Sequence, residues 1–384
     1  MDGKNVKLIV FLLFSTLAYF SCTRNAVKTS QTPSPFHIEI LAAQKAVKEN
    51  PRDVNAVSEL GALYYKSKQY PKAINVLEKA LELNRIHART LCYLGLSYEK
   101  SRQLDLAMAI YLRYLQVATD SPYRKWLEGR HYVVTRKKIK DDIRLLLQQE
   151  DQLDSKAVFD NTVIVLPFLY HGKDQKYFVL GKGIAEMIIN DLSVVKGVKL
   201  IDRLQVEALL EEIASRKTLM ENVQNSTSLI GKLFHAKTVV RGGFNTLDEQ
   251  LVLDVAVWDI AKAEIPGTTT YADSLKNLFS LQKDIVRNLL KSMNIEGHTT
   301  MLQHLQQIPT QNISAFIAYS AGIAKEDAGE YSEAIVFFQK ALELDPNFRE
   351  CLAKIEENKV LATALRDPDK AVLESDYARR FVQE

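Results

Sequence analysis

The spacing of apolar residues divides the chain into a central region with strand-like runs and two flanking helical regions. The central region extends from Thr162 to Met293. Its first apolar run, Val163 to Phe168, is continuous and rich in β-branched residues, which is typical of a strand buried on both faces. Further strands are predicted at 198–203, 238–244, 251–260 and 268–274.

Helical spacing separates these strands. Apolar residues recur every three or four positions at 180–195, 204–216, 228–238 and 275–293. Strands that alternate with helices of ten or more residues predict an α/β domain in which helices pack on a mixed sheet. We place this domain at residues 156–296.

The region before it repeats with a period of 34 residues. Leu60, Gly61 and Tyr64 recur as Leu94, Gly95 and Tyr98. This pattern resembles the tetratricopeptide repeat, in which two antiparallel helices approach closely at small residues. We assign residues 36–119 to such repeats, the first of them degenerate. The sequence predicts one more repeat with a capping helix at 311–366, followed by a tail at 367–384.

The resemblance implies a binding surface. Tetratricopeptide proteins commonly bind peptides along the concave face that the first helix of each repeat lines. Carried over by register, the partner-binding candidates are Asn55, Ser58, Tyr65, Lys66, Arg89, Leu96, Glu99 and Lys100. The alternative is that these helices only pack against the α/β domain, and the sequence does not separate the two interpretations.

The α/β region carries a second resemblance. The order of the segments 201–213, 228–244 and 278–290 is similar to the domain shared by CsgG-type and FlgO-type envelope lipoproteins and the TolB N-terminal domain. The sequence departs from that pattern at His235 and at the Arg241, Gly242, Gly243 triplet. This resemblance implies a bacterial envelope protein.

The amino terminus predicts export and lipidation. Lys4 and Lys7 precede an apolar run from Leu8 to Phe20, which is too short to span a bilayer and typical of a signal peptide at 1–21. Ser21 and Cys22 resemble a lipoprotein processing site, with simple secretion as the alternative. We expect a lipid on Cys22, a tether at 22–35, and, since no aspartate follows Cys22, the periplasmic face of the outer membrane.

A helical linker is predicted at 120–155. Its basic cluster of Arg136, Lys137, Lys138 and Lys140 is typical of a solvated helix face, with contact to anionic headgroups as the alternative. We expect Trp126 to cap the repeats.

Composition and motifs give no support for nucleic-acid binding, a metal site or catalysis. A net charge of +3 over 384 residues gives no argument for a nucleic-acid partner. The seven histidines are scattered, so no metal site is predicted, and no nucleophile motif or cofactor fingerprint occurs. Cys92 and Cys351 fall in helical patterns and are predicted to be buried and unpaired.

Together these features predict a non-enzymatic scaffold or adaptor for envelope proteins or peptides, anchored by its lipid and without a cofactor. The alternative is a ring-forming accessory or channel subunit of a CsgG-type secretion or assembly system, which implies a homo-oligomer. The two connections between the last predicted strands hold about six and seven residues, too few for a membrane-crossing hairpin. This length favours the adaptor.

Overall fold

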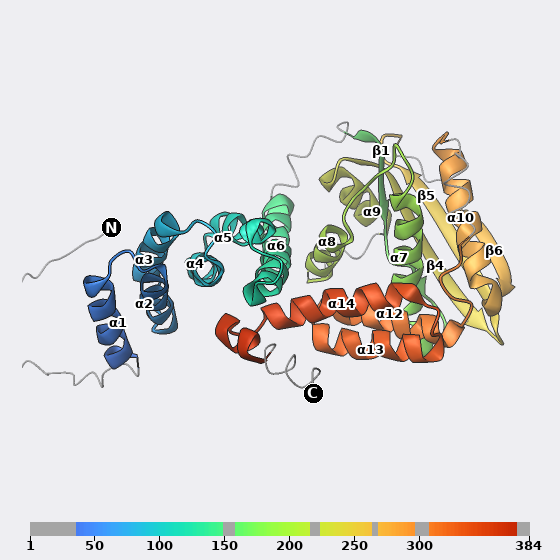
Figure 1. The fold of residues 1–384 in the computed structure, drawn as a ribbon. Coiled ribbons are helices and arrows are strands. Elements are labelled where there is room, and N and C mark those ends of the chain that lie inside the picture. Colours follow the sequence, from blue (N-terminus) through green and yellow to red (C-terminus); the bar gives the residue numbers. More distant parts are fainter. Residues whose placement is uncertain (1–35, 149–157, 216–222, 263–267, 296–306, 375–384) are drawn as a thin grey trace, which may run out of the picture.

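The computed structural model describes residues 36–148, 158–215, 223–262, 268–295 and 307–374 (Figure 1). The predicted signal peptide and Cys22 lie outside these residues. The predicted fold class is confirmed: helical hairpins flank an α/β domain built on a mixed sheet of six strands.

The first helical array consists of antiparallel hairpins. The two helices of each hairpin approach closely at a glycine. A Cβ on Gly61 would lie 2.4 Å from Leu77, and one on Gly95 would lie 2.3 Å from the Tyr111 ring. Asp53 caps the first complete repeat by accepting a hydrogen bond from the backbone N–H of Asn55. The helices are α1 (His37–Glu49), α2 (Val54–Lys66), α3 (Tyr70–Leu83), α4 (Ala88–Lys100), α5 (Leu104–Tyr111) and the 3₁₀ turn η1 (Leu112–Gln116).

A single helix, α6 (Pro122–Gln148), joins the repeats to the α/β domain. Trp126 and Leu127 near its start are buried in the core of the repeats. Ile143 and Leu147 near its end are buried in the core on one face of the sheet. The described part of the predicted linker, up to Gln148, is therefore one helix shared by two cores.

The sheet has the strand order β3-β1-β4-β5-β6, with β2 paired to β4. β1 is parallel to β3 and β4, and β2 is parallel to β4, whereas β5 is antiparallel to both β4 and β6. Asp248 and Glu249 both have positive φ, so the β4–β5 hairpin closes with a two-residue turn. The strands are β1 (Phe159–Val165), β2 (Leu169–Tyr170), β3 (Lys199–Leu200), β4 (Ala236–Leu247), β5 (Gln250–Asp259) and β6 (Thr268–Ser274).

Helices cover both faces of the sheet (Figure 1). On one face lie α7 (Leu180–Ser193) and α10 (Leu278–Ser292), and on the other α8 (Arg203–Ser215) and α9 (Val223–Leu233). The helix predicted at 228–238 ends earlier, because His235 takes a φ of 50° and β4 begins at the next residue.

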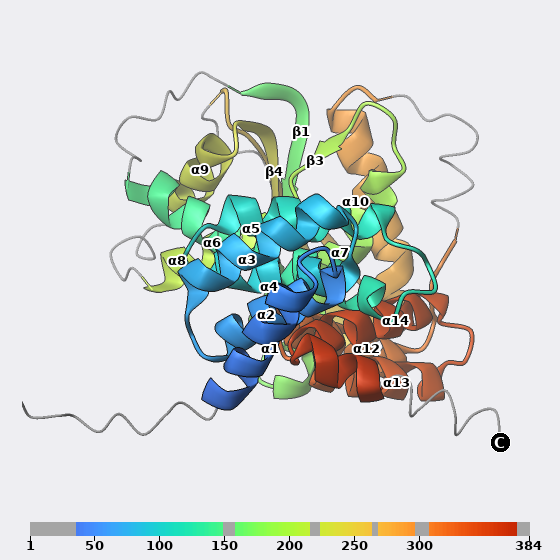
Figure 2. The same cartoon turned by 60° about the vertical axis from the view of Figure 1, so that its left-hand side comes forward.

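The C-terminal helices pack against the rest of the chain. They are α12 (Ile313–Ala328), α13 (Tyr331–Leu344) and α14 (Arg349–Ala364). A Cβ on Gly129 of α6 would lie 2.4 Å from the carbonyl oxygen of Val360, so α6 and α14 approach closely there. Residues 368–374, predicted as part of a tail, are helical and lie against the first repeats (Figure 2).

A buried ionic cluster joins α7, α8 and α12. Arg203 contacts Glu186 at 3.0 Å, Glu326 at 2.6 Å and also Asp327. Lys182 lies 2.7 Å from Glu207 and 2.5 Å from Asp327. Burial and the nearby Asp327 carboxylate raise the pKa of Glu207. Because these charges are buried, removal of any one of them would leave its partners as uncompensated charges and destabilise the fold.

Candidate functional site

Side chains of α2, of α4 and of the start of α6 form one surface of the repeats, which we call the groove, and residues 366–374 lie on it. We call residues 366–374 the C-terminal segment. Figure 1 and Figure 2 show the red segment that follows α14 next to α2 and α4. The contacting side chains come from α2, α4 and α6, which begin at 34-residue intervals, at Val54, Ala88 and Pro122.

The carboxylate of Asp369 is the centre of this contact. Arg89 donates to both of its oxygens, with Nε and Nη2 each at 2.9 Å. Lys66 Nζ donates at 3.0 Å, and the Tyr93 and Tyr123 hydroxyls donate at 2.8 and 3.1 Å. We call Lys66, Arg89, Tyr93 and Tyr123 the carboxylate-binding cluster. A two-bond guanidinium contact with further donors is a strong and directional way to hold a carboxylate.

The surroundings shift the ionisation of these groups. Burial alone would raise the pKa of Asp369, but hydrogen bonds from Arg89, Tyr93 and Lys66 hold it well below its usual range. Burial and the Asp369 carboxylate raise the pKa of Tyr93 and of Tyr123. Burial also raises the pKa of Tyr65 to about 12. At neutral pH the carboxylate is therefore charged and the tyrosines are protonated donors.

Other contacts hold the C-terminal segment in place. Asp367 accepts from the backbone N–H groups of Asp369 and Lys370 at 3.1 and 3.2 Å, which caps the short helix. The Trp126 indole donates to the carbonyl of Arg366 at 3.0 Å. Among the apolar side chains, Pro368 and Ala371 are buried.

A second ion pair lies deeper in the groove. Arg130 of α6 donates to both oxygens of Glu99 at 2.7 Å. The Tyr111 hydroxyl also donates to Glu99 at 2.7 Å, and Glu99 is only 8% exposed. This pair fixes α6 against α4, and three donated hydrogen bonds engage both oxygens of Glu99.

The eight predicted partner-binding residues separate into distinct environments. Lys66 and Arg89 meet on Asp369, and the Tyr65 ring lies 5.7 Å from the Tyr93 ring at a tilt of 58°. Ser58 and Leu96 are buried, and Glu99 is held by Arg130. The two remaining residues lie at the rim: Asn55, whose oxygen is 3.2 Å from His87 Nε2, and the exposed Lys100.

Register alone missed Tyr93, Tyr123, Arg130 and Asp369. Tyr93 follows Arg89 by four positions and therefore shares its helix face. That spacing was a usable signal. Tyr123 and Arg130 belong to α6, and Asp369 belongs to the predicted tail, so their approach depends on the packing of distant helices.

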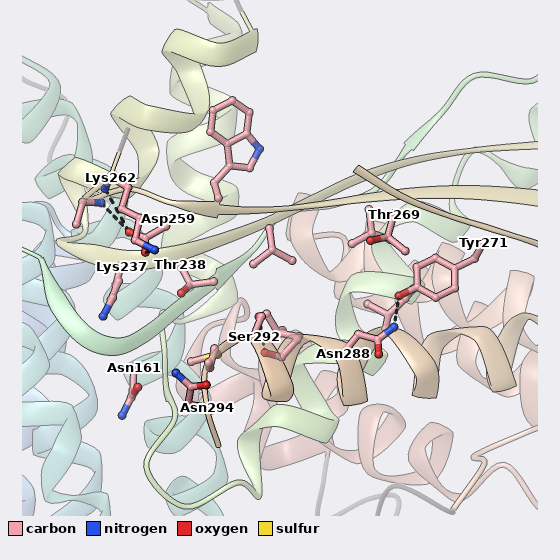
Figure 3. Close-up of a pocket in the computed structure, with 17 residues that line it drawn as sticks. Asn161, Lys237, Thr238, Asp259, Lys262, Thr269, Tyr271, Asn288, Ser292 and Asn294 are labelled. Atoms are coloured by element: carbon pink, nitrogen blue, oxygen red, sulfur yellow. Dashed lines mark hydrogen bonds and ion pairs between the residues drawn. The ribbon is translucent and has the colours of Figure 1, made fainter. Parts of the chain in front are cut away.

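The described residues also enclose a cavity of about 650 Å³ between the sheet and the C-terminal half of α10 (Figure 3). Thr269, Tyr271 and Asn288 lie on one side of it, and Asn288 donates to the Tyr271 hydroxyl at 2.8 Å. Lys237 and Lys262 lie at the other end, where they pair with Asp160 and Asp259. This cavity therefore offers amides and hydroxyls but no cation that lacks a carboxylate neighbour among the described residues.

Within the described ranges, no three His, Cys, Asp or Glu side chains gather in a way that could hold a metal ion. None of the described helices combines the length and the apolar character needed to cross a membrane. The predicted burial of Cys92 and Cys351 as free thiols is confirmed.

Comparison with known proteins supports the helical repeats. Residues 54–87 and 315–348 match the family model of the tetratricopeptide repeat, and they correspond to α2–α3 and α12–α13. No curated protein matches the sequence significantly. The chain thus contains tetratricopeptide repeats on both sides of its α/β domain, and the CsgG/FlgO/TolB-type resemblance of that domain stays a prediction.

Two solved structures show remote similarity. The C-terminal domain of LpoB from Salmonella enterica is 12% identical, with a TM-score of 0.25 over 34% of this chain and 95% of that one. Lipoprotein GNA1162 from Neisseria meningitidis is 14% identical, with a TM-score of 0.24 over 34% of this chain and 96% of that one. These values are too low to support a statement about function.

Proposed function

We propose that this protein is a lipid-anchored, non-enzymatic adaptor of the bacterial envelope whose first repeats hold a protein partner. The observation that carries the proposal is the carboxylate-binding cluster in the groove of these repeats. Lys66, Arg89 and two tyrosine hydroxyls converge on Asp369, an acidic side chain of the C-terminal segment of the same chain. This is the chemistry of peptide recognition: it positions a chain and makes no new bond.

The architecture supports the same role. The groove is assembled from α2, α4 and α6, and α6 continues into the core of the α/β domain. A partner bound in the groove would therefore be held at a fixed position relative to that domain. Rigid placement of one protein relative to another is what an adaptor supplies.

The location rests on the amino terminus of the sequence. Lys4 and Lys7, the apolar run that follows, and Ser21 before Cys22 are the features of an exported lipoprotein. A lipid on Cys22 with a tether at 22–35 would place the repeats in the periplasm next to the outer membrane. More than one acyl chain is needed for stable anchoring, at about 0.8 kcal/mol for each buried methylene.

Partner recovery after crosslinking in intact host cells tests the proposal. Arg89→Ala removes the two-bond donor of the groove, whereas Lys79→Ala removes an exposed cation on α3 outside the carboxylate-binding cluster. We expect Arg89→Ala to reduce recovery of specific partners at least tenfold and Lys79→Ala to leave it unchanged. Equal recovery from both variants would refute an adaptor that works through this groove.

A further inference from the structure

We infer that the C-terminal segment is an internal ligand of the groove, and that the partner is a protein segment that presents an aspartate at the start of a short helix in its place. This inference rests on the proposed function and names the partner's chemistry. The segment shows what the groove accepts: a carboxylate at Asp369, with the small apolar residues Pro368 and Ala371 on either side.

The contacts around Asp369 form a site built from several elements. Five hydrogen bonds reach its two oxygens, from Lys66 of α2, from Arg89 and Tyr93 of α4, and from Tyr123 of α6. Lys66 and Arg89 also lie 5.3 Å from the centre of the Tyr93 ring. An aspartate is therefore recognised by its charge and its two acceptor oxygens, whereas an asparagine keeps the shape but loses the charge and one acceptor.

Charge complementarity specifies an acidic ligand. Without the C-terminal segment, the groove presents three cations, Lys66, Arg89 and Arg130, against two carboxylates, Glu59 and Glu99. The excess of one positive charge lies in a partly buried surface, where an unpaired charge is costly. A segment with one or two acidic side chains completes the balance.

Asp369 makes the charged contacts of the C-terminal segment, and the Trp126 indole together with the burial of Pro368 and Ala371 adds to its attachment. The segment is separated from α14 by a break in the helix at residues 365–367. Leu365, just before the segment, and Leu373, within it, are 54% and 59% exposed and contribute little to its attachment. An equivalent segment of another protein that replaces it must supply a small apolar side chain where Ala371 now contributes to the core of the first repeats.

Fluorescence polarisation with a labelled peptide tests this inference. The probe is a capped peptide of residues 365–374, and the protein is the chain from residue 22 to 384 with Cys22→Ser. Asp369→Ala weakens the internal competitor, so we expect the probe to bind that variant at least tenfold more tightly than the parent. Lys370→Ala, which changes an exposed side chain of the same turn, is the matched control and should bind like the parent.

Two further comparisons show whether the probe uses the same site. A peptide with Asn in place of Asp369 should bind at least tenfold more weakly, and adding Arg89→Ala to the Asp369→Ala protein should remove the gain. Where Asp369→Ala lowers the folded fraction, the isosteric Asp369→Asn protein replaces it. Equal affinity of the probe for the parent and the Asp369 variants, or a dimer of the variant with no probe binding, would overturn the inference.

The experiments distinguish a failure of this inference from a failure of the proposed function. If Arg89→Ala reduces partner recovery in cells while the probe fails to distinguish the proteins, the groove binds partners of another chemistry and only this inference fails. If no groove substitution changes recovery, the adaptor proposal itself fails.

Discussion

Arg89 and Asp369 lie 280 positions apart in the sequence and form two hydrogen bonds of 2.9 Å. This contact ties the first helical array to the end of the chain. Together with the packing of α6 on α14, it makes the repeats on the two sides of the α/β domain parts of one structure. The surface that the repeat register predicts as a partner site thus contains a segment of the same molecule.

Acid pH should remove the stabilisation from Asp369. Its pKa is lowered by folding, so its contribution is complete above the unfolded value of about 4 and is lost as the pH falls through the folded value. At pH 7 we expect Asp369→Asn to reduce the free energy of unfolding by about 1–3 kcal/mol. Urea unfolding from pH 7 to pH 3 measures the difference between the two proteins. A difference that grows on acidification would contradict this assignment.

Removal of Arg203 should be strongly destabilising. Arg203→Met leaves Glu186, Glu326 and Asp327 buried without the guanidinium that they share. We expect a loss of about 3–5 kcal/mol, because breaking one side of a buried ionic cluster leaves charges uncompensated. The exposed pair of Arg287 and Asp284 is the control, and Arg287→Ala should cost less than about 1 kcal/mol. Similar losses of stability for both variants would show that the ionic cluster does not hold α7, α8 and α12 together.

Gly129 should tolerate no side chain. The contact with the Val360 carbonyl means that Gly129→Ala must push α14 away from α6. Overpacking of this kind costs about 1–3 kcal/mol, more than the gain of about 1 kcal/mol in helix propensity. Thermal unfolding measures the net effect, with Lys125→Ala on the exposed face of α6 as the control. A stabilised Gly129→Ala protein would mean that the two helices are not tightly packed.

Cys22→Ser should release the protein from the membrane. Without the thiol no lipid can be attached, and we expect the protein to move from the membrane fraction to the soluble periplasmic fraction. Cell fractionation followed by immunodetection measures the shift, with Cys92→Ser as a control that keeps the amino-terminal cysteine. Continued membrane association of Cys22→Ser would show that another element anchors the chain.

Local patterns predicted much of the fold. The period-two and period-3.6 spacings placed the strands and helices of the α/β domain, and the 34-residue period placed the hairpins. Helix ends were less predictable, as at His235, where a positive φ ends the helix before the predicted position. The continuity of α6 across two cores also depends on both of its packing partners.

The sequence predicted only some of the residues of the candidate site. Lys66 and Arg89 follow from the repeat register, but Asp369 reaches them only because α6 and α14 cross closely at Gly129. Such a crossing is a property of tertiary packing, and no pattern near residue 369 encodes it. The sequence therefore predicted Lys66 and Arg89 as binding residues, but it did not predict that Asp369 contacts them.

Reversal of the Arg89 and Asp369 charges tests the central claim most directly. Arg89→Asp with Asp369→Arg restores an internal ion pair but inverts the polarity that the groove presents to a partner. We expect the melting temperature of the double variant to exceed that of Arg89→Asp alone, while crosslinked partner recovery in cells stays as low as for Arg89→Asp. If recovery returns together with stability, the groove is a packing surface between parts of this chain and the binding claim is wrong.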